Sequence, residues 1–201
     1  MLIEKHNQIS EEWSIYCDQN DIDMFNQKRV QVIDFQENKY LYSVVKEYIV
    51  FLIRKDDLMD FFNKINVRWR IKTVNSVHSK ISKYINNNIE KGRVPVFKCL
   101  NDVIGTRIIT ENEFSFEEIN SFIEKNYNGL KCISASKNGY KATHIYFKTD
   151  NKHFQWELQI WSKNNEISNI KSHIKHKEAY ADWENEKPKI GGNHGNTLYI
   201  D

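Results

Sequence analysis

The spacing of apolar residues changes about a third of the way along the chain, and this change constrains the fold more than any other feature. Before it, apolar residues recur at helical spacing over residues 37–64, which predicts one or two amphipathic helices. Ser10, followed by two glutamates, predicts the start of a helix near 10–20. After it, apolar residues occupy every odd position from Val67 to Ile71, as in a half-buried strand. A helical layer over residues 1–65 is therefore expected to precede a sheet.

The remainder of the chain alternates between strand and helix patterns. The expected segments are a strand at 67–72, a helix at 75–91 closed by Gly92, a strand at 105–110, a helix at 115–126, strands at 130–135, 140–148 and 153–161, and a helix at 164–186. This order predicts the α+β class, with a mixed sheet of about five strands flanked by helices. A single domain is expected over 1–201, with its core at 66–187 and a loose tail at 188–201.

Composition argues against several classes of protein. Hydrophobic residues make up 40% of the chain and aromatic residues 13%, which disfavours disorder, and no apolar run reaches the roughly 18 residues of a membrane span. The first residues lack the features of a secretory signal, and the three cysteines are far apart, so a cytoplasmic protein with reduced thiols and no membrane partner is expected. The formal charge of +2 combines a net −4 over residues 1–66 (8 basic, 12 acidic) with a net +6 over the rest (21 basic, 15 acidic). Any electropositive site is expected in the second part.

Two of the expected strands carry polar residues on one face. Apolar residues occupy every even position from Phe154 to Ile160, so Glu157 and Gln159 are expected on the opposite face. The same spacing places Tyr140 and His144 on one face of their strand. Periodicity alone favours the simpler interpretation, the polar face of a half-exposed sheet, over a functional site.

Four short motifs resemble those of the RelA/SpoT-type nucleotide pyrophosphokinases, the alarmone synthetases. The similar segments are Arg70 to Lys80 (RxKxxxSxxxK), Asp102 to Arg107 (DxxGxR), Asn138 to His144 (NGYxSxH) and Glu157 to Ile160 (the ExQI of ExQIRT). His173 resembles the histidine of an EH pair in the following helix. Each motif is weak alone, but their order and spacing together are specific. The resemblance implies a nucleotidyltransferase-like synthetase domain that covers over half of the chain.

The resemblance also implies an activity and a role for each matching residue. The implied reaction transfers the β,γ-pyrophosphate of ATP to a ribose 3′-hydroxyl. Asp102 and Glu157 are the implied catalytic carboxylates and Mg²⁺ ligands, and Glu157 shares the metal or accepts the hydroxyl proton. The implied ATP-binding residues, which hold the triphosphate and sandwich the adenine, are Arg70, Lys72, Ser76, Lys80 and Arg107. The implied acceptor-binding residues, which stack on or hydrogen-bond to the second nucleotide, are Lys137, Tyr140, His144 and Gln159.

Departures from the family pattern bear on the acceptor. Synthetases that act on GDP or GTP usually carry a KDYI...PKxNGY stretch and the arginine of ExQIRT. This chain lacks the DY, places Lys137 one residue closer to Tyr140, and has Trp161 in the arginine position. A pocket for guanosine 5′-polyphosphates is therefore expected to be weakened. With no His-Asp hydrolase domain and only a short segment after His176, the chain resembles the toxic small alarmone synthetases of toxin–antitoxin pairs.

Two acceptors remain open for such a toxin. Transfer to the 3′ CCA adenosine of tRNA is favoured, and synthesis of (p)ppGpp or (p)ppApp from a free nucleotide is the alternative. A tRNA acceptor requires cations near the site, and the candidates, which could equally be solvated surface charges, are Lys28, Arg29, Lys171, Lys175 and Lys177. An antitoxin protein is an expected partner. A catalytically decayed nucleotide-binding or RNA-binding module is the alternative of another class, and the presence of both Asp102 and Glu157 disfavours it.

Overall fold

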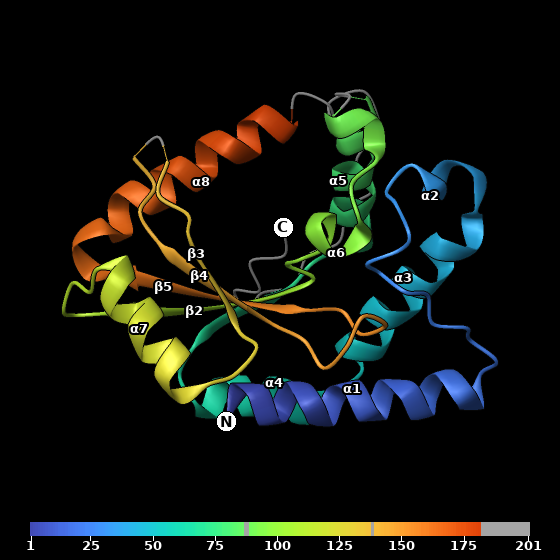
Figure 1. The fold of residues 1–201 in the computed structure, drawn as a ribbon, viewed down its shortest axis with the longest axis horizontal. Coiled ribbons are helices and arrows are strands. Elements are labelled where there is room, and N and C mark those ends of the chain that lie inside the picture. Colours follow the sequence, from blue (N-terminus) through green and yellow to red (C-terminus); the bar gives the residue numbers. More distant parts are fainter. Residues whose placement is uncertain (87–88, 138, 182–201) are drawn as a thin grey trace, which may run out of the picture. The chain divides into compact units, whose positions relative to one another are not determined.

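The chain forms a mixed sheet of five strands flanked by helices (Figure 1). The computed structural model describes residues 1–86, 89–137 and 139–181. In chain order the strands are β1 (Arg68–Ile71), β2 (Ile104–Thr110), β3 (Lys131–Ser134), β4 (Thr143–Phe147) and β5 (Trp156–Ser162). They are hydrogen-bonded in the order β1-β2-β5-β4-β3, so the last strand in the sequence is the central one. The predicted α+β class is confirmed.

The chain divides into two compact units. The first contains Met1–Thr106 and Tyr146–Leu158, and the second contains Arg107–Ile145 and the chain from Gln159 onward. Strands β2, β4 and β5 each contribute residues to both units. The single domain expected over 1–201 stays a prediction, and the two units are described separately below.

Aromatic residues form the core of the first unit. Its helices are α1 (Leu2–Gln19), α2 (Asp34–Glu37), α3 (Lys39–Ile53), α4 (Asp56–Lys64), α5 (Val74–Asn86) and α6 (Val96–Cys99), with a 3-10 turn η1 (Ile89–Gly92). Tyr48 of α3 stacks on Phe154 with ring centroids 4.6 Å apart and meets Trp13 of α1 edge-on at 5.1 Å. Ile9, Trp13 and Cys17 recur every four residues along α1, and all three are buried. This stripe packs α1 onto the unit, as expected for an amphipathic helix.

Helix α1 begins earlier than the sequence pattern predicted. Ser10 lies buried inside the helix, so the predicted helix start at Ser10 is wrong. The reason is a tertiary contact of His6, which is buried and whose Nε2 lies 3.2 Å from the carbonyl oxygen of Phe154. The His6 ring also meets Trp156 edge-on, with centroids 5.2 Å apart. These contacts hold the first turns of α1 against the unit.

Two other predicted segments differ in the structure, and a third is described only in part. The helix expected to reach residue 91 is described to Asn86, and Glu90 and Lys91 have left-handed φ angles of 48° and 55° that do not continue a right-handed helix. The strand expected at 140–148 begins at Thr143, because Tyr140 pairs with Lys137 across a tight turn. The last helix is described to Ala181. Residues 182–186 of that predicted helix and the predicted loose tail lie outside the described residues.

The second unit carries α7 (Phe116–Asn126), a 3-10 turn η2 (Lys163–Asn165) and α8 (Glu166–Ala181). α7 begins with a capping box, in which the Ser115 side chain accepts from the Glu118 N–H and the Glu118 carboxylate accepts from the Ser115 N–H. Asn169 of α8 is fully buried and exchanges two hydrogen bonds of 2.8 Å with the backbone of Lys141, which precedes β4. Across the described residues of both units, no helix is long and apolar enough to cross a membrane.

Candidate active site

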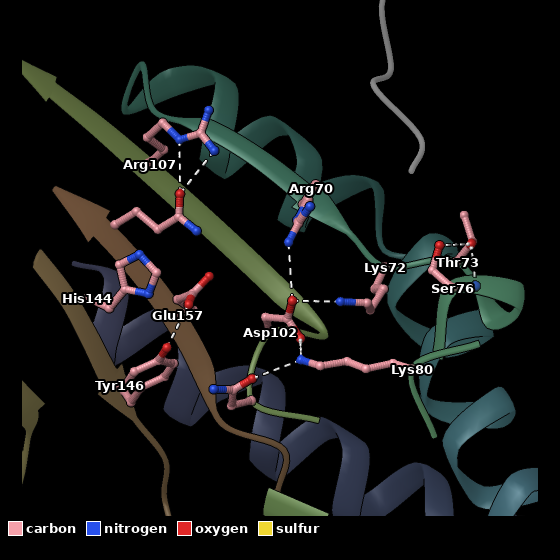
Figure 2. A network of polar contacts seen from close by, with 12 residues as sticks. Arg70, Lys72, Thr73, Ser76, Lys80, Asp102, Arg107, His144, Tyr146 and Glu157 are labelled. Carbon is pink, nitrogen blue, oxygen red and sulfur yellow. Dashed lines mark hydrogen bonds and ion pairs between the residues drawn. The ribbon is translucent and has the colours of Figure 1, made fainter. Parts of the chain in front are cut away.

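Three cations converge on the carboxylate of Asp102 in the first unit (Figure 2). Lys72 Nζ donates to Oδ2 at 2.6 Å, and Arg70 Nη2 donates to the same oxygen at 3.2 Å. Lys80 Nζ donates to Oδ1 at 2.9 Å. The side chains of Asp102 and Lys72 are both buried. Three positive charges against one negative charge leave a local excess of two, which suits a polyanionic ligand.

The end of β1 places Arg70 and Lys72 beside Asp102. The N–H of Lys72 donates to the carbonyl oxygen of Val103 at 2.8 Å, which joins the end of β1 to the segment that carries Asp102. Alternation with the apolar residues of this half-buried strand predicts an open face for Arg70 and Lys72, but Lys72 is only 8% exposed. The prediction of an open face is wrong at this residue, because the segment around Asp102 covers it.

The start of α5 places the other ATP-site candidates. Thr73 caps this helix, since its Oγ1 accepts from the N–H of Ser76 at 3.1 Å and its hydroxyl donates to Ser76 Oγ at 3.0 Å. Lys80, one turn further along, also donates to Asn101 Oδ1 at 3.2 Å. Sequence reasoning missed Thr73 and Asn101. A threonine directly before a predicted helix is a cap signal that could have identified the first.

The charges of this cluster shift the pKa values of its members. Burial alone would raise the pKa of Asp102, but Lys80, Lys72 and Arg70 together hold it far below its usual range. Burial lowers the pKa of Lys72, and only part of this effect is offset by Asp102. Burial would also lower the pKa of Lys80, but the attraction of Asp102 outweighs it and raises that pKa. Asp102 is therefore ionised at neutral pH, and Lys80 is the more firmly charged lysine.

Glu157 lies on the central strand β5 and is only 4% exposed. The hydroxyl of Tyr146 donates to its Oε1 at 2.8 Å (Figure 2). Gly105 of β2 leaves room between the side chains of Glu157 and Arg70, because a Cβ at this position would lie 3.9 Å from Glu157 Oε2 and 3.4 Å from Arg70 Nε. Asp102 and Glu157 both lie in the first unit, and the side chains of Arg70 and Glu157 both lie near Gly105.

Tyr146 is a site residue that sequence reasoning missed. It lies on β4 two residues after His144, and alternate residues of a strand share a face. The alternation that grouped Tyr140 with His144 could therefore have been extended by one step. Its hydroxyl was overlooked because none of the quoted motifs includes this position.

A second polar cluster lies in the second unit and contains the candidates Arg107, Gln159, Tyr140 and His144. Arg107 donates from Nε and Nη2 to Gln159 Oε1 at 3.1 and 3.0 Å, and its guanidinium carbon lies 3.4 Å from the centroid of the Trp161 ring. Trp161 Nε1 donates to the hydroxyl of Tyr140 at 3.1 Å, and that hydroxyl lies 2.9 Å from His144 Nε2. Arg107, a candidate ATP-binding residue, is thus hydrogen-bonded to Gln159 and is linked to Tyr140 and His144 through Trp161.

Trp161 changes the interpretation of β5. The face that carries Glu157 and Gln159 was expected to be the open one, but both residues are buried and Trp161, on the same face, is fully buried. The expectation is wrong, since the burial of all three side chains shows that this face of β5 is covered.

A comparison with protein families decides the family. The model of the region found in RelA/SpoT proteins matches residues 69–181, which is more than half of the chain. The chain belongs to the RelA/SpoT family of pyrophosphokinases. Both clusters lie inside the matched segment.

Solved structures of two small alarmone synthetases and of one further protein are similar to this chain at low identity. Small alarmone synthetase 1 from Bacillus subtilis is 18% identical, with 77% of this chain and 83% of that chain covered and a TM-score of 0.36. Small alarmone synthetase 2 from the same organism is 20% identical, with 75% and 84% covered and a TM-score of 0.35. The smu.1046c protein from Streptococcus mutans UA159 is 19% identical, with 71% and 77% covered and a TM-score of 0.36. A comparison with curated protein sequences finds no match.

The oxygen donors of the first unit fit the divalent metal that RelA/SpoT pyrophosphokinases use. Mg²⁺ usually binds one or two carboxylates together with phosphate oxygens of the substrate. Asp102 and Glu157 supply two carboxylates, and within the described part of the chain no group of three or more His, Cys, Asp or Glu could hold a metal. Oδ2 of Asp102 already accepts from two cations and Oδ1 from one, so a metal at this carboxylate would compete with them for its oxygens.

The remaining candidates of the RelA/SpoT interpretation are surface cations. Lys28 and Arg29 are exposed in the first unit, and Lys171 is exposed on α8 of the second. Lys137 is exposed at the turn, where its backbone pairs with that of Tyr140. The side chains of His173, Lys175 and Lys177 lie outside the described part of the structure.

The hydrogen bond between Tyr146 and Glu157 gives a first prediction. Tyr146→Phe is expected to lower kcat for pyrophosphate transfer about tenfold, because a hydrogen bond to a charged group contributes about 1.5–3 kcal/mol. KM for ATP is expected to change less than about twofold, since the bond that is removed holds Glu157, a candidate catalytic carboxylate. The matched control is Tyr16→Phe, which removes the longer 3.4 Å bond from Tyr16 to Glu47. Equal kcat values for both variants would show that Tyr146 has no positioning role.

Proposed function

We propose that this protein is an ATP-dependent pyrophosphokinase that transfers the β,γ-pyrophosphate of ATP to a ribose 3′-hydroxyl. The observation that carries the proposal is the triple cation pairing of Asp102, with a second carboxylate, Glu157, buried in the same unit. A triphosphate supplies the negative charge that these cations lack. Phosphoryl-type transfer depends on positioning and on neutralising charge, and the cluster offers both.

The chemistry assigns a task to each group of the cluster. When ATP binds, Lys72 and Lys80 exchange an oxygen of Asp102 for phosphate oxygens, and Asp102 becomes available as a ligand. Mg²⁺, when bound, would neutralise the phosphates and polarise the bond that breaks. The acceptor 3′-oxygen forms a bond to the β-phosphorus, the bond from that phosphorus to the α,β-bridging oxygen breaks, and AMP leaves. Glu157, held by Tyr146, is the proposed acceptor of the hydroxyl proton.

The proposed acceptor is the 3′-terminal adenosine of tRNA. The observation that favours it is Trp161, which fills the position of a family arginine and is fully buried between Arg107 and Tyr140. An indole offers no charge to a nucleoside 5′-polyphosphate, whereas the 5′ side of a terminal adenosine is a single phosphodiester. A tRNA blocked in this way could not be aminoacylated, so the protein would act as a translation-inhibiting toxin that requires an antitoxin partner.

Synthesis of (p)ppGpp or (p)ppApp from a free nucleotide is the second candidate. The exposed Lys137 beside Tyr140 favours it, because one cation of the usual acceptor stretch remains close to the stacking ring. The two candidates share the donor reaction and differ only in what carries the 3′-hydroxyl.

A labelling experiment separates these functions. The protein is incubated with Mg²⁺, γ-labelled ATP and one acceptor: deacylated tRNA, the same tRNA ending in 3′-deoxyadenosine, GDP, GTP or no addition beyond ATP. Label is expected in the first tRNA and not in the deoxy control, because only the first offers a 3′-hydroxyl. Label confined to a free nucleotide would overturn the tRNA proposal, and label in no acceptor would overturn the enzymatic proposal in favour of a binding module.

A further inference from the structure

Exposed cations from separate segments of the first unit gather in one region. The chain around Gln31 pairs antiparallel with the chain around Pro95, and the N–H of Phe97 donates to the carbonyl oxygen of Gln27 at 3.1 Å. Lys28 and Lys98 each follow one residue of this bonded pair, so the two segments that carry them lie side by side. Both are exposed, and so is Arg29. The sequence separates Lys28 from Lys98 by 70 positions, so only the fold brings them together.

The loop between β4 and β5 adds cations to this region. Gln27 donates from its backbone N–H to the carbonyl oxygen of Asn151 at 2.8 Å and from its side chain to the carbonyl oxygen of Lys152 at 3.0 Å. Lys148 Nζ lies 5.0 Å from the centroid of the Phe97 ring. Burial lowers the pKa of Lys148, and the positive charge of Lys28 adds to this effect, whereas Asp150 opposes it. Lys28 and Lys148 are thus close enough to repel each other.

The region keeps its positive charge. Among the described residues, Lys28, Arg29, Lys98 and Lys152 form no ion pair. Asp150 is the acidic neighbour, but its Oδ1 already accepts from the N–H groups of Lys152 and His153 and lies 2.9 Å from His153 Nδ1. Its negative charge is engaged locally. The basic patch, defined as Lys28, Arg29, Lys98, Lys148 and Lys152, therefore combines four cations that form no ion pair in the described structure with Lys148, whose Nζ donates to Asn151 Oδ1 at 2.6 Å.

The chain fixes how far this patch can lie from the candidate active site. Lys98 precedes Asp102 by four residues, so their Cα atoms can be at most about 14 Å apart at about 3.6 Å per residue. Stacked nucleotides place successive phosphates of one strand roughly 3.4 Å apart. Lys98 therefore lies within about four nucleotides of a ribose held beside Asp102. ATP has its own cations there, so a second set at this distance suits the backbone of a polynucleotide acceptor.

We propose that the basic patch binds backbone phosphates of an RNA strand a few nucleotides upstream of the 3′-terminal ribose that enters the active site. The inference rests on the proposed tRNA acceptor. It extends the RNA-binding surface from the two adjacent residues Lys28 and Arg29 to a surface built from three segments. Phosphate contacts of this kind position the strand without reading its sequence. Any deacylated tRNA would then be accepted, whatever its anticodon.

Charge reversal at one exposed lysine of each segment tests the patch. The variant is Lys28→Glu/Lys98→Glu/Lys152→Glu, and the control is Lys39→Glu/Lys46→Glu/Lys64→Glu, which changes the net charge equally at exposed positions of α3 and α4. Binding of fluorescently labelled deacylated tRNA is measured by anisotropy from 50 to 200 mM salt, together with ATP affinity and label transfer. The patch variant is expected to bind tRNA at least tenfold more weakly than the control. Its slope of log K against log salt is expected to fall by about 2, at roughly 0.7 per lost phosphate contact.

The outcomes separate the patch from the reaction. Unchanged tRNA binding and labelling by the patch variant would overturn the inference, whatever the wild type labels. The patch would then be assigned to binding of a protein partner. Wild-type protein that binds tRNA through the patch but labels only a free nucleotide would overturn the acceptor proposal and leave RNA binding intact. Unchanged ATP affinity in both variants is the expected sign that their folds are preserved.

Discussion

Replacing Asp102 with asparagine is expected to abolish pyrophosphate transfer, with kcat falling at least about 10³-fold. Asparagine keeps the size of the side chain but carries no charge, so it cannot serve as an anionic ligand of Mg²⁺. It also leaves Lys72, Lys80 and Arg70 without their counter-charge. ATP affinity is expected to fall much less than kcat, because all three cations remain to bind phosphate. This affinity is measured with a non-hydrolysable ATP analogue.

The same substitution is expected to destabilise the fold by roughly 3 kcal/mol, the lower end of the range for removing one member of a buried ion pair. The lower end applies because asparagine still accepts a hydrogen bond and the Arg70 side chain is 29% exposed. The pKa of Asp102 is held below its unfolded value of about 3.9, so its stabilisation is complete above about pH 5. As the pH falls below about 4 toward the folded pKa, this stabilisation is progressively lost. Urea unfolding of both proteins at pH 7, 5, 4 and 3 is expected to show a constant difference that shrinks only in acid.

Asp60→Asn is the matched control, because Asp60 is exposed on α4. It is expected to leave both transfer and the unfolding free energy near those of the wild type. A stable but inactive Asp102→Asn protein would show that the ion pairs contribute less to stability than to chemistry. Substantial transfer by this variant would remove Asp102 from the reaction.

Periodicity in the sequence predicted most of the elements but not what covers them. Alternation over 153–161 identifies β5 correctly, yet it assigns Glu157 and Gln159 to an open face. The structure buries both, together with Trp161 on the same face, so this face of β5 is covered. A strand pattern records which residues share a face. It does not record whether a second layer covers that face, which depends on the order of strands in the sheet.

The candidate site depends on contacts between distant parts of the chain. Asp102 takes its cations from residues 22 to 32 positions earlier, and no local pattern couples such positions. Resemblance to a family supplied these residues because its motifs summarise a fold. The resemblance could not supply Tyr146, which lies outside the motifs. Nor could it bring the segments of Lys28, Lys98 and Lys148 together, because that depends on how Gln27 bonds to two remote segments. Such residues follow from the structure alone.

The other large effect is expected at Tyr140 in the second unit. Tyr140→Ala is expected to reduce transfer at least about 100-fold, because stacking of a base on an aromatic ring contributes about 1–3 kcal/mol and the hydrogen bonds to Trp161 and His144 are lost as well. ATP affinity is expected to change less than about twofold. Tyr140→Phe, which keeps the ring and loses only the hydroxyl, is expected to retain most of the stacking contribution. Transfer is measured with labelled ATP under saturating donor.

Arg107→Ala is the counterpart that makes this prediction specific. It is expected to weaken ATP binding about tenfold, since a guanidinium face on an aromatic system contributes about 0.5–2 kcal/mol and its charge is lost too. Arg107→Lys is expected to recover little, because an ammonium has no flat face. A guanidinium has two faces, and the Trp161 ring takes one, so the adenine contact requires the other. If Tyr140→Ala weakened ATP binding and Arg107→Ala spared it, the donor and acceptor roles of these two residues would have to be exchanged.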